Sequence, residues 1–197
     1  MKWDLIALIE EFARGKINIA RLNYVIITLV PKTADAKQIQ KFRPICLLNV
    51  SFKIITKVLM NRLNLVAADV ISPVQTAFIK GRFILECVVM AHEVIHEIHR
   101  YGSSGLILKL DYEKGYDRVS WDFLKEMLLS RGFGSKWVGW VMSTIHQGTF
   151  QVRINDTNGP QFAGGKGLKQ GDPIHPCCLI WWLMFFLKCC RKLLIIT

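Results

Sequence analysis

The sequence predicts an α+β fold, and three observations support that prediction. The chain has 197 residues, 51% of them apolar, which is enough to bury one sizeable core in one or two domains. Segments with a helical repeat of apolar residues are mixed with segments rich in β-forming residues. Helices and strands do not alternate regularly, as they would in a doubly wound parallel sheet, so we expect an α+β arrangement.

Apolar periodicity and breaker residues predict the elements of the first hundred residues. Apolar residues recur with a helical period in three segments, and two of these segments stop before a glycine. A β-rich run that ends at Pro31 predicts a strand, and Pro44 biases Arg43 toward extended geometry. The predicted elements are helices at 4–14, 51–65 and 83–100, a strand at 23–30, a loop at 33–41, a turn at 72–73 and a basic loop at 80–82.

The second half of the chain centres on a short apolar run, 105–110, that ends at Asp111. A run of this length, opened by glycine and closed by polar residues, predicts a buried strand. A carboxylate at the end of such a strand is well placed to hold a metal ion. Ser120 predicts the N-cap of the next helix. That helix is expected to end at Gly132, followed by a helix capped by Ser135 and ending at Gly148, a strand at 149–155 and a turn at 156–160.

The net charge indicates the kind of partner, and the cysteines indicate the cellular compartment. The net charge of +11 favours a polyanionic partner, nucleic acid before an anionic membrane, although a soluble domain that is simply basic has the same composition. No two of the six cysteines form a C-x-x-C pair, which argues against a zinc knuckle. We expect reduced thiols in an intracellular protein of the nucleus or cytoplasm, without a signal peptide and without a membrane partner.

Two stretches carry a family resemblance. LDYEKGYDRVSWDFL at 110–124 and GLKQGDPIHP at 167–176 resemble the first two catalytic motifs in the reverse transcriptase domain of non-LTR (LINE-type) retrotransposons, most closely the plant kind. The family patterns look like LDFEKAYDRVSWDFL and GLRQGDPLSP. The resemblance extends from about Asn23 to Leu179 through LVPK, FRPICLLN, KIITKVLMNRL, ISPVQTAFIKGR and RGFGSKWV.

This resemblance implies the fingers and a partial palm of a right-hand polymerase. The partial reverse transcriptase domain is expected over 1–179, with the fingers at about 1–100 and the palm part at about 101–179. Residues 180–197 no longer resemble the family and form a divergent apolar tail. The family's thumb and endonuclease are absent, so we expect a truncated fragment.

The resemblance also implies two-metal nucleotidyl transfer with Mg²⁺ (or Mn²⁺) as cofactor. Asp111 matches the first metal ligand, and the backbone carbonyl of Tyr112 is the second; a turn-capping Asp is the alternative. Tyr116 matches an aromatic under the sugar of the incoming nucleotide that selects deoxynucleotides, with a core tyrosine as the alternative. Asp117 is expected to be structural, holding the turn before the Ser120 helix.

Other matched positions imply contacts with nucleotide and template. Gln170 and Gly171 match the loop beside the nucleotide and template base, where glycine allows close approach and glutamine offers a donor and an acceptor. Lys32 and Arg43 match positions that contact triphosphate or template, with a solvated basic surface as the alternative. Lys80 and Arg82 are weaker candidates for contact with the template backbone. The implied partners are an RNA template, a DNA primer and deoxynucleotide triphosphates.

One short motif suggests a different class of enzyme. His92, Glu93 and His96 form H-E-x-x-H on a predicted helix, a spacing that binds zinc in metallopeptidases. The extended form of that motif fails, because His99 and Gly102 stand where Gly and His are required. A zinc peptidase is therefore a remote alternative.

The end of the sequence departs from the family. The third motif, an aromatic-Ala-Asp-Asp hairpin that supplies further metal ligands, is missing, and no Asp or Glu follows Asp172. We therefore expect the 197-residue chain to be inactive, and a non-catalytic basic nucleic-acid-binding remnant is the alternative. His175 stands where the family usually has Ser. The run containing Trp181 and Trp182 is expected to lack a covering element.

Overall fold

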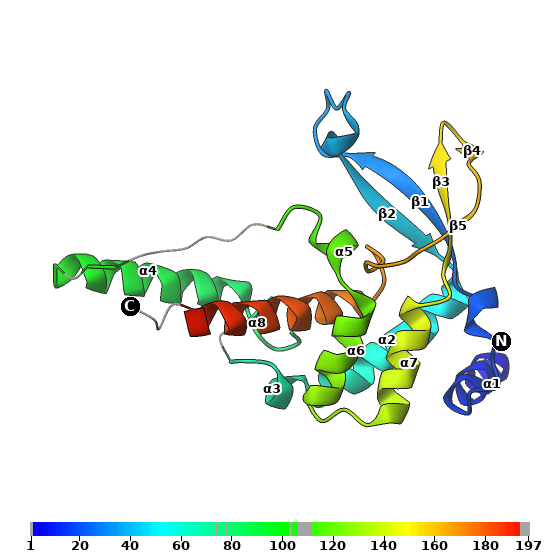
Figure 1. The fold of residues 1–197 in the computed structure, drawn as a ribbon, viewed down its shortest axis with the longest axis horizontal. Coiled ribbons are helices and arrows are strands. Elements are labelled where there is room, and N and C mark those ends of the chain that lie inside the picture. Colours follow the sequence, from blue (N-terminus) through cyan, green and yellow to red (C-terminus); the bar gives the residue numbers. More distant parts are fainter. Residues whose placement is uncertain (1, 74, 78, 103, 106–111, 194–197) are drawn as a thin grey trace. The chain divides into compact units, whose positions relative to one another are not determined.

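The computed structural model describes residues 2–73, 75–77, 79–102, 104–105 and 112–193, without the side chains of residues 68 and 185–193. The chain forms two compact units, one of Met1–Asn61 with Gly115–Thr197 and the other of Arg62–Lys114. The first unit combines a sheet with several helices, which confirms an α+β fold at this level (Figure 1). The predicted strand at 106–110 and Asp111 lie outside the described residues.

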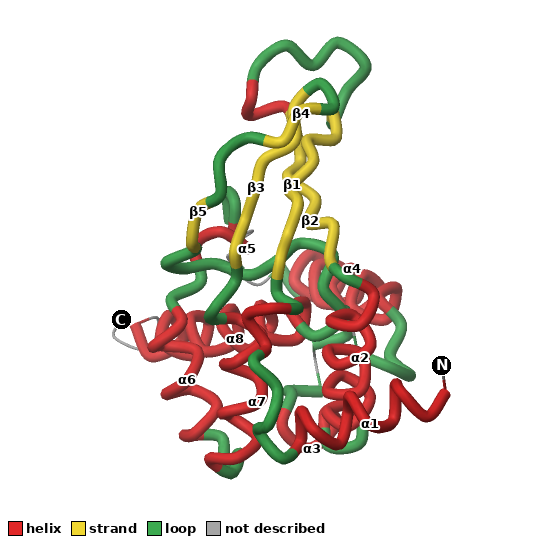
Figure 2. Tube along the Cα trace, turned by 90° about the vertical axis from the view of Figure 1, so that its right-hand side faces the viewer, coloured by secondary structure: helices red, strands yellow, loops and turns green. Residues whose placement is uncertain are grey.

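The sheet of the first unit joins strands that are far apart in the sequence. β1 pairs antiparallel with β2 and parallel with β3, and β3 pairs antiparallel with both β4 and β5. In Figure 2 these strands run side by side, with α6, α7 and α8 beneath them. The strands are β1 (Tyr24–Pro31), β2 (Phe42–Leu48), β3 (Thr149–Ile154), β4 (Thr157–Asn158) and β5 (Phe162–Ala163).

The hairpin between β3 and β4 turns one residue earlier than predicted. Asn155 and Asp156 have φ angles of 47° and 61°, so the turn has two left-handed residues and β4 begins at Thr157. Asn and Asp adopt this conformation more readily than other non-glycine residues, and two such residues match the twist of a hairpin.

Strand register assigns one face of the sheet to the helices. Val25 is paired with Leu48 on one side and with Phe150 on the other, and Ile27 is paired with Cys46. Directly paired residues project to the same face, so these side chains share it. Val25 is fully buried, which places the core of the first unit under this face.

The helices of the first unit supply most of that core. α6 packs against both α7 and α8, and its Leu124 and Leu128 are fully buried. Phe12 of α1 packs against Trp140 of α7, with ring centroids 6.3 Å apart. The helical segments are α1 (Lys2–Ala13), η1 (Ile19–Arg21), η2 (Ile39–Lys41), α2 (Val50–Asn64, whose last three residues belong to the second unit), α5 (Gly115–Arg118), α6 (Trp121–Ser130), α7 (Ser135–Ile145) and α8 (His175–Leu193).

The predicted N-cap is found for α6 but not for α7. Ser120 caps α6, its hydroxyl accepting from the amide of Phe123 at 3.4 Å, as predicted. The prediction that Ser135 caps α7 was wrong, because Gly134 holds the extended N-cap conformation and Ser135 is already helical. α7 also ends at Ile145, before the predicted Gly148.

The start of the apolar tail is covered. The prediction of an uncovered run was wrong for Trp181, whose side chain is 1% exposed. Its ring lies 5.3 Å from that of Phe133, in the turn after α6. The contact between α6 and α8 therefore provides the cover that the sequence did not reveal.

The second unit contains α3 (Ala67–Val70) and α4 (Ile84–Arg100). Arg82 donates to the carbonyls of Ser72 and Gln75 at 2.7 and 2.8 Å. Its guanidinium therefore stabilises the loop that precedes α4. α4, which is described over its whole length, has no buried side chain. Among the described residues, no helix is long and apolar enough to span a membrane.

Candidate functional site

Backbone hydrogen bonds join the two motif stretches. We call residues 167–172 the Gln170 loop. The amide of Leu168 donates to the carbonyl of Tyr116 at 2.7 Å, and the amide of Gly167 donates to the carbonyl of Val119 at 2.8 Å. The indole of Trp121 donates to the carbonyl of Gly167 at 2.7 Å. The Gln170 loop is therefore fastened to α5 and to the start of α6.

Two glycines permit this close approach. Gly167 has a φ angle of +88°, and a Cβ atom there would lie 3.1 Å from the backbone of Tyr116 and Asp117. Gly171 has a φ angle of +111°, and a Cβ atom there would lie 3.2 Å from the carbonyl oxygen of Cys46. Both positions need a left-handed backbone and the room that only glycine leaves.

The opposite side of the loop is held by β2 and by a buried lysine. The carbonyl of Gln170 accepts from the amide of Cys46 at 2.9 Å. Lys169 is 3% exposed, and its ammonium donates to Asn23 Oδ1 at 2.5 Å and to the carbonyl of Thr144 at 2.6 Å. Burial lowers the pKa of Lys169 to about 8, and the nearby Asp172 and Cys46 oppose that shift.

Two further buried polar side chains follow the lysine. Asp172 accepts from the amide of Ile174 at 3.0 Å, which turns the chain into α8. His175 Nδ1 accepts from the amide of Lys169 at 2.8 Å. Burial lowers the pKa of His175, so its imidazole is neutral at physiological pH. His175, which stands where the family usually has Ser, therefore stabilises the Gln170 loop through its hydrogen bond with the backbone of Lys169.

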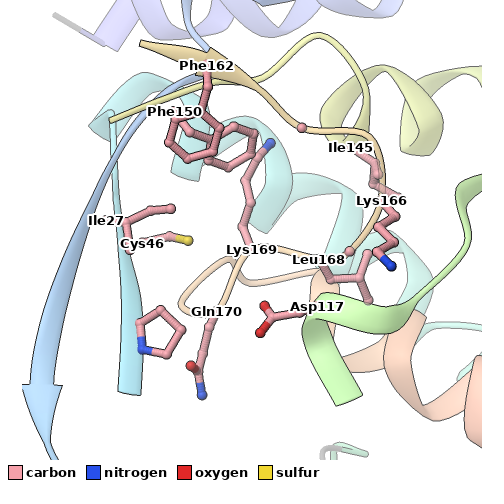
Figure 3. Close-up of a pocket in the computed structure, with 13 residues that line it drawn as sticks. Ile27, Cys46, Asp117, Ile145, Phe150, Phe162, Lys166, Leu168, Lys169 and Gln170 are labelled. Atoms are coloured by element: carbon pink, nitrogen blue, oxygen red, sulfur yellow. The ribbon is translucent and has the colours of Figure 1, made fainter. Parts of the chain in front are cut away.

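A cavity of about 180 Å³ opens beside the loop (Figure 3). Its apolar wall includes Ile27, Phe150 and Phe162, and the two phenylalanine rings stack with centroids 5.8 Å apart. Asp117 and Gln170 supply polar groups on the other side. We call this cavity the Gln170 pocket.

The structure brings Asp117 into the pocket, although the sequence predicted a purely structural role for it. Its carboxylate is exposed and lies in Figure 3 on the same side of the pocket as Gln170. The one feature of the sequence that could have indicated this is that Asp117 directly follows Tyr116. The carbonyl of Tyr116 accepts the hydrogen bond that holds the Gln170 loop.

Tyr116 lies next to the pocket through its backbone, but its side chain is not part of the lining. The side chain is half-buried, and burial raises the pKa of its hydroxyl, with the thiols of Cys177 and Cys178 adding to the effect. The selection of deoxynucleotides by Tyr116 stays a prediction.

Lys32 and Arg43 lie at the far end of the β1–β2 pair and do not line the Gln170 pocket. Both are exposed, and the ammonium of Lys32 donates to the carbonyl of Gln40 at 3.1 Å. Strand alternation places Arg43 on the face opposite Pro44, which does line the pocket. Their contact with phosphate stays a prediction.

The predicted metal ligands cannot be assembled from the described residues. Asp111 is outside them, and Tyr112 is half-buried in the second unit. Within the described part of the chain, no three His, Cys, Asp or Glu side chains gather as metal ligands. The described donors alone therefore do not make a magnesium site.

The same observation bears on the zinc alternative. His92, Glu93 and His96 are exposed on α4. No third ligand joins them among the residues that the structure describes, so the zinc peptidase is not favoured.

The mixed α/β fold and the paired motifs fit a template-directed polymerase, and comparison with known sequences defines the class. The sequence pattern of the family "Reverse transcriptase (RNA-dependent DNA polymerase)" matches residues 30–193, so the chain belongs to the reverse transcriptase family. The match includes both motif stretches and continues through α8.

Relatives among curated proteins specify the kind of element. The chain is 32% identical over 178 residues to the Transposon TX1 uncharacterized 149 kDa protein of Xenopus laevis, covering 87% of this chain and 14% of that protein. It is 28% identical over 147 residues to the Retrovirus-related Pol polyprotein from type-2 retrotransposable element R2DM of Drosophila melanogaster, covering 75% and 14%. The chain thus spans about one seventh of these relatives. They confirm the resemblance to a LINE-type reverse transcriptase domain, while the plant affinity stays a prediction.

Proposed function

We propose that the first unit binds an RNA template annealed to a DNA primer and holds the templating base at the Gln170 pocket. In this proposal β1 and β2 belong to the fingers, and α5 to α7, β3 to β5 and the start of α8 belong to the palm part. The observation that carries it is the hydrogen-bonded contact between the Gln170 loop and the Tyr116 segment beside the pocket.

The chemistry of the lining suits a nucleobase. The carboxamide of Gln170 offers a donor and an acceptor, and the carboxylate of Asp117 accepts hydrogen bonds. The rings of Phe150 and Phe162 provide flat apolar surface, and bases bind such surfaces by stacking. Gly171, where a Cβ atom would meet the carbonyl oxygen of Cys46, lets the loop approach β2 closely beside the pocket.

The charge of the chain suits the phosphates. A net charge of +11 favours binding through phosphate neutralisation, which weakens as salt rises. Lys32 and Arg43 are proposed to contact template or triphosphate phosphate groups.

Metal binding is proposed for Asp111 and the carbonyl of Tyr112, with Mg²⁺ or Mn²⁺ as the ion. When bound, such ions supply charge stabilisation for nucleotidyl transfer. Two close ions need more anionic ligands than these, and no Asp or Glu follows Asp172. We therefore propose that a polypeptide of these 197 residues binds primer–template without extending it, which is the non-catalytic alternative.

The test is a fluorescence titration with an RNA template that carries 2-aminopurine at the templating position beside a DNA primer. We expect binding to weaken at least about tenfold between roughly 50 and 200 mM salt, because phosphate contacts release counterions. The 2-aminopurine signal should change on binding, and Gln170→Ala should reduce that change. Gln161→Ala is the matched control, because Gln161 is exposed and lies outside the pocket lining.

Two results would contradict the proposal. One is an affinity that does not depend on salt. The other is a 2-aminopurine signal that responds equally to both glutamine substitutions, which would place the templating base away from the Gln170 pocket.

A further inference from the structure

The buried ammonium of Lys169 connects three parts of the first unit. Its hydrogen bonds reach Asn23, just before β1, and the carbonyl of Thr144 in the last turn of α7. The ring of Phe52 in α2 lies 4.7 Å from the same nitrogen. Asn23 and Thr144 are themselves fully buried. A side chain of the Gln170 loop is thus held by elements that lie far from the loop in the sequence.

A buried ammonium needs a reason, because removing a charge from water is costly unless its donors are satisfied. The groups around Lys169 are mostly neutral: the Asn23 carboxamide, the Thr144 carbonyl and the Phe52 ring. Asp172 acts on it through its charge, and His175 Nδ1 accepts a hydrogen bond from its backbone amide. Hydrogen bonds from a charged donor are stronger than neutral ones, so this junction is a strong fixing point for the loop.

The junction also determines where Gln170 lies. Lys169 and Gln170 are consecutive, and Figure 3 shows their side chains extending in opposite directions from the loop. The backbone of residue 169 is fixed as well, because its amide donates to His175. Holding Lys169 on the inner side therefore turns Gln170 toward the open part of the pocket.

We propose that Lys169 is a positioning residue, whose buried ammonium holds the Gln170 loop so that Gln170 faces the templating base. The role toward the base rests on the proposed function. The role toward the loop does not, and it is measurable without any ligand.

Two hydrogen-bond donors to the loop provide that measurement. The indole of Trp121 donates to Gly167, and the amide of Cys46 donates to Gln170, on opposite sides of the loop. Their exchange with solvent is read by NMR on the ¹⁵N-labelled full chain, with Trp121→Phe assigning the indole signal. Lys169→Met removes the ammonium and keeps an unbranched side chain. Lys125→Met is the matched control, because Lys125 carries the same charge but is exposed on α6 and lies outside the pocket lining.

We expect Lys169→Met to raise both exchange rates about tenfold to a hundredfold, as the loss of a hydrogen bond from a charged donor implies. Lys125→Met should leave them unchanged. With the 2-aminopurine template, Lys169→Met should reduce the signal change as Gln170→Ala does, while overall affinity falls no more than with Lys125→Met.

Equal exchange in Lys169→Met and the wild type would overturn the proposal. If Lys169→Met fails to fold, Asn23→Ser provides the test, because it keeps the lysine, shortens its acceptor and leaves room for water. Faster exchange at both reporters would support the anchor, and unchanged exchange would overturn it. If the loop loosens but the wild type gives no 2-aminopurine signal, the anchor stands and the proposed template site fails.

Discussion

Gly167→Ala is the substitution that probes the contact between the two motif stretches most severely. An alanine at a φ angle of +88° costs about 1–3 kcal/mol for its left-handed backbone. The new Cβ atom would also lie 3.1 Å from the backbone of Tyr116 and Asp117, where no flexible side chain can move aside. Displacing the loop weakens the bonds that Gly167 and Leu168 donate, at roughly 0.5–1.5 kcal/mol each. We expect a total loss of about 2–6 kcal/mol.

The assay is urea unfolding of the full chain, followed by tryptophan fluorescence. Gly165→Ala is the matched control, because a Cβ atom at Gly165 meets nothing within 4 Å and no left-handed φ angle is found there. We expect this control to change the unfolding free energy by less than about 0.5 kcal/mol. If the two alanine variants unfold at the same urea concentration, the close packing of the loop on the Tyr116 segment is not what stabilises this site.

Three other predictions concern stability. Because burial lowers the pKa of Lys169 from 10.5 to about 8, the unfolded chain binds a proton that the folded chain lacks between these values, so the unfolding free energy should rise above about pH 8. Burial raises the pKa of Cys177 from 9.0 to about 11 and that of Cys178 well above 9.0, so above about pH 9 the two thiols together lower the unfolding free energy more than the lysine raises it. Urea titrations under reducing conditions should therefore show a maximum near pH 9, and Lys169→Met should lack the rise. Ser120→Ala should lower the unfolding free energy by about 1 kcal/mol through loss of the α6 cap, and an unchanged urea midpoint would contradict that role. Leu128→Ala, at a fully buried position of α6, should cost about 2–5 kcal/mol, and a cost below 1 kcal/mol would mean that α6 does not pack as described.

Local signals in the sequence were enough for much of the fold. Ser120 identifies the start of α6 because the cap bond joins residues three apart. The alternation of Phe150 and Val152 identifies β3 and its inner face because side chains in a strand alternate. Both features depend on neighbours in the sequence.

Features that depend on distant partners could not be predicted. The parallel pairing of β1 with β3 joins Tyr24 to Thr149, and no local pattern specifies it. Lysine is rarely buried, and the partner that explains Lys169 lies 146 positions away at Asn23. Trp181 was expected to be uncovered for the same reason, because its cover comes from the turn after α6.

Photo-crosslinking tests the proposed template site most directly. An RNA template with 4-thiouridine at the templating position is annealed to a DNA primer, bound to the full chain, irradiated and digested, and the crosslinked peptides are identified by mass spectrometry. We predict crosslinks to segments that line the Gln170 pocket, near Asp117, Phe150 or Gln170, and their loss in Gln170→Ala relative to Gln161→Ala. Crosslinks confined to segments outside the pocket lining, unchanged by either substitution, would contradict the proposal that the templating base lies at the Gln170 pocket.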